Sequence, residues 1–143
     1  MRPLVRSRVT ATVVAGAVMG LVAGCDGGAV VEAGDVTVLV SEPLGYGMDA
    51  LLVGRLEVVG GCLGAGGSVV VWPEGTQVVN EDPVTISIPG EGTFTVGDDV
   101  EVGGGYVHEP GAGTSGSGPS EVGGVGVPAA CAAYGVFLAS PGR

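Results

Sequence analysis

Residues 68–72, Ser-Val-Val-Val-Trp, decide the fold of this 143-residue chain. The run is apolar, rich in β-branched side chains and without alternation, which is typical of a strand covered on both faces. Pro73 follows at once and ends the strand, because proline has no backbone N–H to donate to a sheet. The stretch therefore predicts a central strand of a β domain, buried from two sides.

Strands with one buried face flank this central run. Around Arg55 and Glu57 apolar residues alternate with polar ones, and the same period of two recurs at 84–88 and 93–96. A last strand is predicted at 134–138, and no segment after residue 24 has the 3.6-residue period of a helix. Turns recur roughly every 8–12 residues. We expect an all-β domain, either a small five-stranded OB-like barrel, our first choice, or a compact sandwich.

The N-terminal segment is typical of a secretory signal. A head with three arginines precedes an apolar run from 9 to 22, which is shorter than the roughly 20 residues that a membrane-spanning helix needs. Val22-Ala23-Gly24-Cys25 then resembles the lipobox of bacterial lipoproteins. That resemblance implies cleavage after Gly24, a diacylglyceryl thioether and further acyl chains such as palmitate on Cys25, and attachment to the extracytoplasmic face of the cell membrane. An ordinary cleavable signal, the plainer alternative, needs no cysteine at its end.

The charge of the mature chain excludes two classes of partner. After residue 24 the chain has two basic residues, Arg55 and Arg143, and fifteen carboxylates, so the formal charge of the mature chain is −13. Such a surface repels nucleic acid and anionic lipid headgroups. We expect the membrane as a partner through the acyl anchor alone, together with an envelope protein or an envelope polymer.

The chain divides into three predicted parts. Residues 1–24 are the signal peptide, residues 25–50 are the lipidated cysteine with a glycine-rich tether or lead-in, and residues 51–140 form the β domain. Within the tether, residues 36–40 are either a first strand or an extended lead-in. Residues 103–126 are rich in Gly, Ser and Pro, which predicts a mobile surface loop.

Cys62 and Cys131 form an even pair once Cys25 is lipidated. In an oxidising compartment such a pair predicts a disulfide, which would tie the last strand to the start of the sheet. Free buried thiols and a metal site are the alternatives. A metal site would need further His or carboxylate partners, and the chain contains a single histidine, His108.

Several short motifs occur between residues 54 and 138. They are Gly54-Arg55-Leu56, Gly61-Cys62-Leu63, the run from Val70 to Thr76, Gly97-Asp98-Asp99-Val100, Gly103-Gly104-Gly105 and Cys131. Together they resemble a family of small secreted or lipid-anchored proteins of actinobacteria. The resemblance implies a fold and a cell-surface address, and it implies no particular chemistry.

Acidic turns are the candidate ligand sites of the chain. Asp98, Asp99 and Glu101 could supply oxygens to Ca²⁺, because Asp99 and Glu101 have the alternate spacing of calcium loops. Calcium takes six to eight oxygens, however, and no full Asp-x-Asp-x-Asp-Gly loop is present. The plainer interpretation makes Asp98 an Asx-type turn and leaves the other acids solvated. A second acidic pair, Glu81-Asp82, lies at another predicted turn.

Residues for catalysis follow no recognisable pattern. His108 has Ser115, Ser117 and Ser120 near it in the sequence, but none of these serines lies in a Gly-x-Ser-x-Gly elbow. A glycosidase would use two facing carboxylates in a cleft lined by aromatics, and the pool of aromatic residues is small. Trp72, a possible binding edge, is expected in the core instead.

The leading hypothesis is a non-enzymatic binding or accessory module at the cell envelope. Its candidate contact surfaces are the 103–126 loop and the acidic turns, and no cofactor is expected beyond the acyl modification of Cys25. Two alternatives belong to other classes: a calcium-dependent structural element and a small hydrolase acting on cell-wall material.

Overall fold

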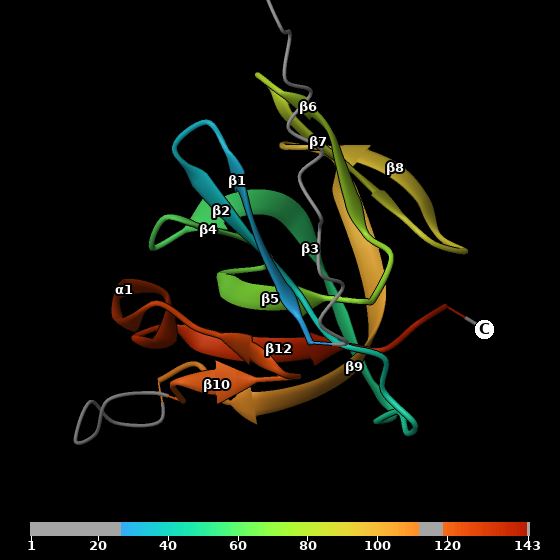
Figure 1. The fold of residues 1–143 in the computed structure, drawn as a ribbon, viewed down its shortest axis with the longest axis vertical. Coiled ribbons are helices and arrows are strands. Elements are labelled where there is room, and N and C mark those ends of the chain that lie inside the picture. Colours follow the sequence, from blue (N-terminus) through green and yellow to red (C-terminus); the bar gives the residue numbers. More distant parts are fainter. Residues whose placement is uncertain (1–26, 112–118, 143) are drawn as a thin grey trace, which may run out of the picture.

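A computed structural model of the chain describes residues 27–111 and 119–142. The elements in this part are twelve strands and one short helix (Figure 1). In chain order they are β1 (Ala29–Ala33), β2 (Val36–Val40), β3 (Ala50–Val59), β4 (Cys62–Ala65), β5 (Ser68–Trp72), β6 (Gln77–Glu81), β7 (Val84–Ile88), β8 (Gly92–Thr95), β9 (Asp99–His108), β10 (Glu121–Val122), β11 (Val125–Gly126), α1 (Ala129–Ala132) and β12 (Gly135–Ala139). The predicted all-β class is confirmed.

Five of the strands close into a barrel. β3 pairs with β4, β4 with β5, β5 with β12, β12 with β9, and β9 with β3 again. The β5–β12 pair is parallel and the other four pairs are antiparallel. This order and these directions are those of the OB fold, a five-stranded Greek-key barrel. Of the two predicted architectures, the structure adopts the OB-like barrel.

The β1–β2 hairpin completes the wall of the barrel. β2 enters between the start of β4 and the end of β5, where Thr37 pairs with Cys62 and Val40 pairs with Trp72. Residues 29–33, predicted as part of the tether, instead form β1, and residues 36–40 form a strand, one of the two alternatives that the sequence left open. Val38, Leu39 and Val40 leave water by joining the sheet, and burial of a single such side chain stabilises the fold by about 1.5–3 kcal/mol.

The inner core fills the barrel with large apolar side chains. Trp72 and Phe137 are fully buried, and the ring of Tyr106 meets Phe137 edge to face with the ring centroids 5.1 Å apart. The small sheet β6-β7-β8 packs the apolar face of β7 onto this core, since Val84, Ile86 and Ile88 belong to the same cluster. Figure 1 shows this sheet beside the upper part of β9.

An outer core covers the other face of β5. Val69 and Val71 point out of the barrel and pack with Val122 and Val125 of the β10–β11 hairpin and with Cys131 of α1. The prediction that residues 68–72 are covered on both faces is confirmed, because inner and outer cores meet at this strand. No helix among the described residues is long and apolar enough to span a membrane.

The glycine-rich stretch at 103–126 is more ordered than the sequence indicates. Gly104 pairs with Ala50 on one side and with Ala139 on the other, so β9 continues to His108. A Cβ at Gly104 would collide with Leu138 and Phe137, and the residue has a φ of 153°, so glycine is required there by crowding. The predicted mobile loop is therefore wrong for 103–108 and for the hairpin at 121–126, and residues 112–118 lie outside the described part.

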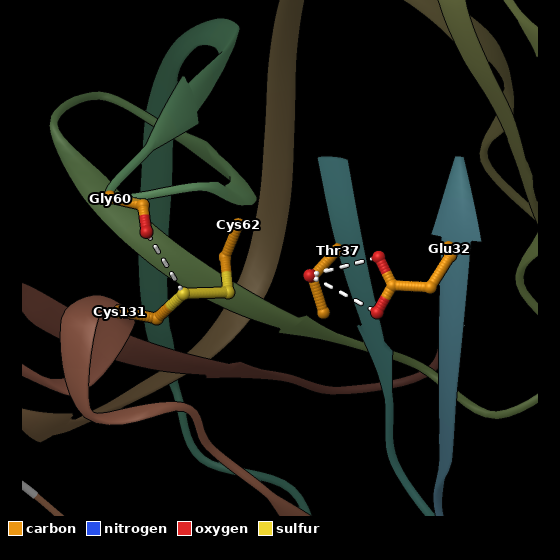
Figure 2. Close-up of a disulfide and its surroundings, with 5 residues drawn as sticks. All are labelled: Glu32, Thr37, Gly60, Cys62 and Cys131. Carbon is orange, nitrogen blue, oxygen red and sulfur yellow. Dashed lines mark hydrogen bonds between the residues drawn. A yellow bond between two sulfur atoms is a disulfide. The ribbon is translucent and has the colours of Figure 1, made fainter. Parts of the chain in front are cut away.

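The predicted disulfide is confirmed. The Sγ atoms of Cys62 and Cys131 are bonded at 2.00 Å, and the bond joins the first residue of β4 to α1, which leads directly into β12 (Figure 2). The Cys131 sulfur also lies 3.4 Å from the carbonyl oxygen of Gly60. The bond pins the last barrel strand to the β3–β4 turn, as the sequence predicts.

Candidate functional site: a cleft between two strand edges

β1 and β6 each leave one edge unpaired in the described part, as do β8 and the two strands of the β10–β11 hairpin. β1 pairs with β2 alone, and β6 pairs with β7 alone. These two edges face each other across a hollow of about 610 Å³. An unpaired edge presents a row of free backbone N–H and C=O groups, which can template the pairing of another strand. We call this hollow, together with its continuation at the β1–β2 turn, the β1–β6 cleft.

The floor of the β1–β6 cleft is apolar. Val31 of β1 and Val78 of β6 are half-buried and pack against the inner core beneath them. One wall carries an exposed valine, since Val79 is 55% exposed. An apolar floor with alternating outward side chains matches the way in which an added strand places its own side chains.

The rim of the β1–β6 cleft is acidic. Glu32, Glu81 and Asp82 line it, and the continuation of about 500 Å³ toward the β1–β2 turn adds Asp35. No basic residue lines either hollow in the described part. The cleft therefore combines apolar contact area with four carboxylates, and it favours a partner that carries positive charge.

Short-range hydrogen bonds hold the Glu32 carboxylate and the β6–β7 turn in place. The Thr37 hydroxyl donates to the Glu32 carboxylate, with oxygen–oxygen distances of 3.2 and 3.3 Å (Figure 2). At the β6–β7 turn, the Asn80 side-chain amide donates to the Pro83 carbonyl at 3.0 Å, and the Thr85 hydroxyl donates to the same oxygen at 3.1 Å. The strand ends that carry the carboxylates are thus tied to their own turns, which lowers the entropy lost on binding.

The predicted acidic turn at residues 98–101 lies outside the β1–β6 cleft and makes other contacts. Asp98 accepts a hydrogen bond from the backbone N–H of Thr95 at 2.9 Å, the Asx-type turn of the plainer interpretation. Asp99 lies 3.8 Å from the Arg55 guanidinium, and both side chains are exposed. Glu101 is exposed on β9 opposite Val53. Among residues 27–111 and 119–142, no group of three or more His, Cys, Asp or Glu side chains converges as an ion site.

The remaining sequence candidates do not come together as a catalytic group. His108 ends β9 opposite Val136, and Ser120 lies just before β10. Ser115 and Ser117 lie outside the described residues, as does Cys25. Trp72 is fully buried, as expected for a core residue.

Sequence reasoning found one half of the β1–β6 cleft and missed the other half. Glu81-Asp82 was predicted as an exposed acidic turn, and the structure places it at the rim. β6 was not predicted, and β1 was assigned to the tether. The available signal was the Val78-Val79 pair after Thr76, but only the tertiary structure shows that it faces β1.

Comparisons with protein-family models, with curated proteins and with solved structures find no match for this chain. The resemblance to small actinobacterial envelope proteins therefore rests on its sequence motifs alone.

Proposed function

We propose that this protein is a lipid-anchored, extracytoplasmic binding module without enzymatic activity, and that its β1–β6 cleft holds an extended, basic segment of another envelope protein. The observation that carries the proposal is the pair of unpaired strand edges that face each other over an apolar floor and an acidic rim. The lipobox at Val22–Cys25 supports the membrane anchor, and the Cys62–Cys131 bond suits an oxidising compartment.

The direction of the β1–β2 hairpin supports this arrangement. Ala29 pairs with Val40 at the open end of the hairpin, and the acidic rim lies toward the turn at Gly34. Cys25 precedes Ala29 by four residues, so an anchor on Cys25 attaches at the open end. The rim at the turn end then faces away from the membrane, where another envelope protein can reach it.

Strand addition explains how so small a cleft could bind a partner. An unpaired edge supplies backbone hydrogen bonds, the valines accept alternate side chains of the added segment, and the carboxylates select basic residues and speed association. A single exposed ion pair contributes only about 0.2–1 kcal/mol. Affinity therefore comes mainly from the backbone and apolar contacts, whereas the charges determine which segment binds.

Photo-crosslinking on intact cells tests the cleft. A photoreactive amino acid at Val79, in the β1–β6 cleft, should capture one protein reproducibly, because that side chain is 55% exposed beside the free edges. The matched control is the same amino acid at Val107, which is 47% exposed on β9. The adducts are identified by purification and mass spectrometry. Equal capture from both positions, or capture of a glycan polymer at Val79, would contradict the proposal.

Charge reversal at the rim should weaken this capture. Glu81→Lys places a like charge against the basic segment, and we expect about a fivefold loss of adduct from Val79, which corresponds to about 1 kcal/mol. Glu101→Lys reverses an exposed acid of β9 outside the cleft and should leave the yield unchanged. Similar losses in the two variants would point to a general effect of net charge and reject a specific rim.

Metabolic labelling with a radioactive fatty acid tests the anchor separately. Cys25→Ala should abolish incorporation of label, because the thioether has no other acceptor in the predicted lipobox. Cys62→Ala leaves the lipobox intact and should retain the label. Incorporation of label into the Cys25→Ala protein would show that the anchor is not at this residue.

A further inference from the structure

Exposed apolar side chains gather in the segment between β2 and β3 and at the start of β3. Tyr46 is 70%, Met48 is 37% and Leu51 is 58% exposed. They line a shallow groove of about 620 Å³, whose other side is formed by Gly103 and the C-terminal residues 140–142. Figure 1 shows this segment at the opposite end of the molecule from β6. The segment is therefore a second surface, distinct from the β1–β6 cleft.

This segment is attached firmly to the barrel. It follows directly on Val40, and the backbone N–H groups of Ser41 and Glu42 donate to the carbonyl oxygens of Trp72 and Gly123, each at 2.8 Å. Met48 lies against the backbone of β9, where a Cβ at Gly105 would collide with its side chain. The apolar side chains are thus presented from a fixed backbone.

The start of β1 lies at the same end of the hairpin as this segment. Ala29 pairs with Val40, the residue from which the segment departs. Cys25 precedes Ala29 by four positions, and four residues of fully extended chain span at most about 14 Å. If Cys25 carries acyl chains, as the proposed function requires, the bilayer surface lies within about that distance of the open end of the hairpin.

We propose that the segment from Leu44 to Leu51 is a bilayer-contacting surface, and that Tyr46, Met48 and Leu51 enter the interfacial layer beside the acyl chains of Cys25. Tyrosine favours this layer, because its ring is apolar and its hydroxyl remains hydrated. The acyl chains on Cys25 anchor the protein, and an apolar contact made by the protein itself adds to that attachment. It also fixes the orientation in which the β1–β6 cleft is directed away from the membrane.

The lipid dependence of this contact follows from the charge of the chain. Asp49 and Glu91 border the same groove, and the mature chain has a formal charge of −13. Contact is therefore driven by apolar burial and opposed by anionic headgroups. Added salt should restore part of the contact on anionic membranes, because it screens the repulsion.

Depth-dependent fluorescence quenching tests the proposal on the lipidated full-length protein in phosphatidylcholine vesicles with brominated acyl chains. Tyr46→Trp should lose emission and shift to the blue relative to the same protein in unbrominated vesicles. Tyr134→Trp is the matched control, since Tyr134 is 47% exposed and packs against Gly60, at the far end of β3 from Leu51. Its emission should not change. The native Trp72 is fully buried and provides a constant background.

The outcomes separate this proposal from the proposed anchor. Leu51→Trp serves as a second reporter. If the protein floats with the vesicles but neither Tyr46→Trp nor Leu51→Trp is quenched, the bilayer-contacting surface is wrong and the anchor remains supported. Protein that does not float overturns the anchor and this surface together. Replacing part of the phosphatidylcholine by phosphatidylglycerol should reduce quenching, and salt should recover it. Stronger quenching with phosphatidylglycerol would contradict an apolar contact.

Discussion

Replacing Cys62 and Cys131 together by alanine lowers the free energy of unfolding by about 4 kcal/mol. The bond joins residues 69 positions apart, and in the chain-entropy model a loop of this length restricts the unfolded chain by about that amount. Domains of this size are typically stable by about 5–15 kcal/mol, so the loss is a large fraction of the total. Urea denaturation of the oxidised protein and of the double variant measures the difference.

The reduced wild-type protein is the matched control for the disulfide variant. It keeps both side chains in place and removes only the covalent bond, so its urea midpoint should fall close to that of the double variant. A reduced protein as stable as the oxidised one would contradict the predicted contribution of the bond. A double variant much less stable than the reduced protein would show instead that the two side chains matter mainly through packing, since both are almost fully buried.

Trp72→Ala should destabilise the barrel by about 3–5 kcal/mol, the usual cost of truncating a buried aromatic side chain. Trp72 ends β5, is fully buried, and belongs to the inner core with Phe137 and Leu56. Its backbone also accepts the hydrogen bond from Ser41, which the substitution leaves in place. Thermal and urea denaturation measure the change, and an unaltered melting temperature would contradict the central place of this side chain.

Trp72→Phe is the informative companion variant. The indole Nε1–H of Trp72 is buried and has no hydrogen-bond partner among the described residues. An unpaired buried donor costs about 1–3 kcal/mol, and phenylalanine removes it while retaining most of the apolar volume. The expected loss of stability is therefore much smaller than for alanine, about 1 kcal/mol or less. Equal losses for the two variants would show that the indole nitrogen makes a favourable contact.

The local alternation of apolar and polar residues predicted strands correctly wherever one face of the strand is buried and the other is exposed to solvent. β3, β7 and β8 occur where alternation predicted them, because period two directly reports which side chains face the core. The continuous apolar run Val69–Trp72 of β5 was likewise informative, since a strand without alternating polar residues is typically covered on both faces. These elements were sufficient for the all-β class, and the choice between barrel and sandwich came from the structure.

Glycine-rich strands were the main source of error. β4 contains Gly64 and is not among the predicted strands, and the end of β9 contains Gly103 to Gly105 and was predicted as a loop. At Gly64 an added Cβ would collide with the backbone of Ser68, so the close approach of β4 and β5 requires glycine. Composition cannot distinguish glycine that keeps a chain flexible from glycine that lets two strands approach.

The sequence by itself determined the all-β class, the central strand at 68–72, the cysteine pair and the acidic charge, because each depends on residue type or on neighbours close in the chain. Only the tertiary structure decided that β1 and β2 join the barrel and that β1 faces β6 across the acidic cleft. It also decided that the apolar segment before β3 lies at the end where β1 begins. These are contacts between segments far apart in the chain, and they depend on how the barrel closes, which local periodicity does not encode.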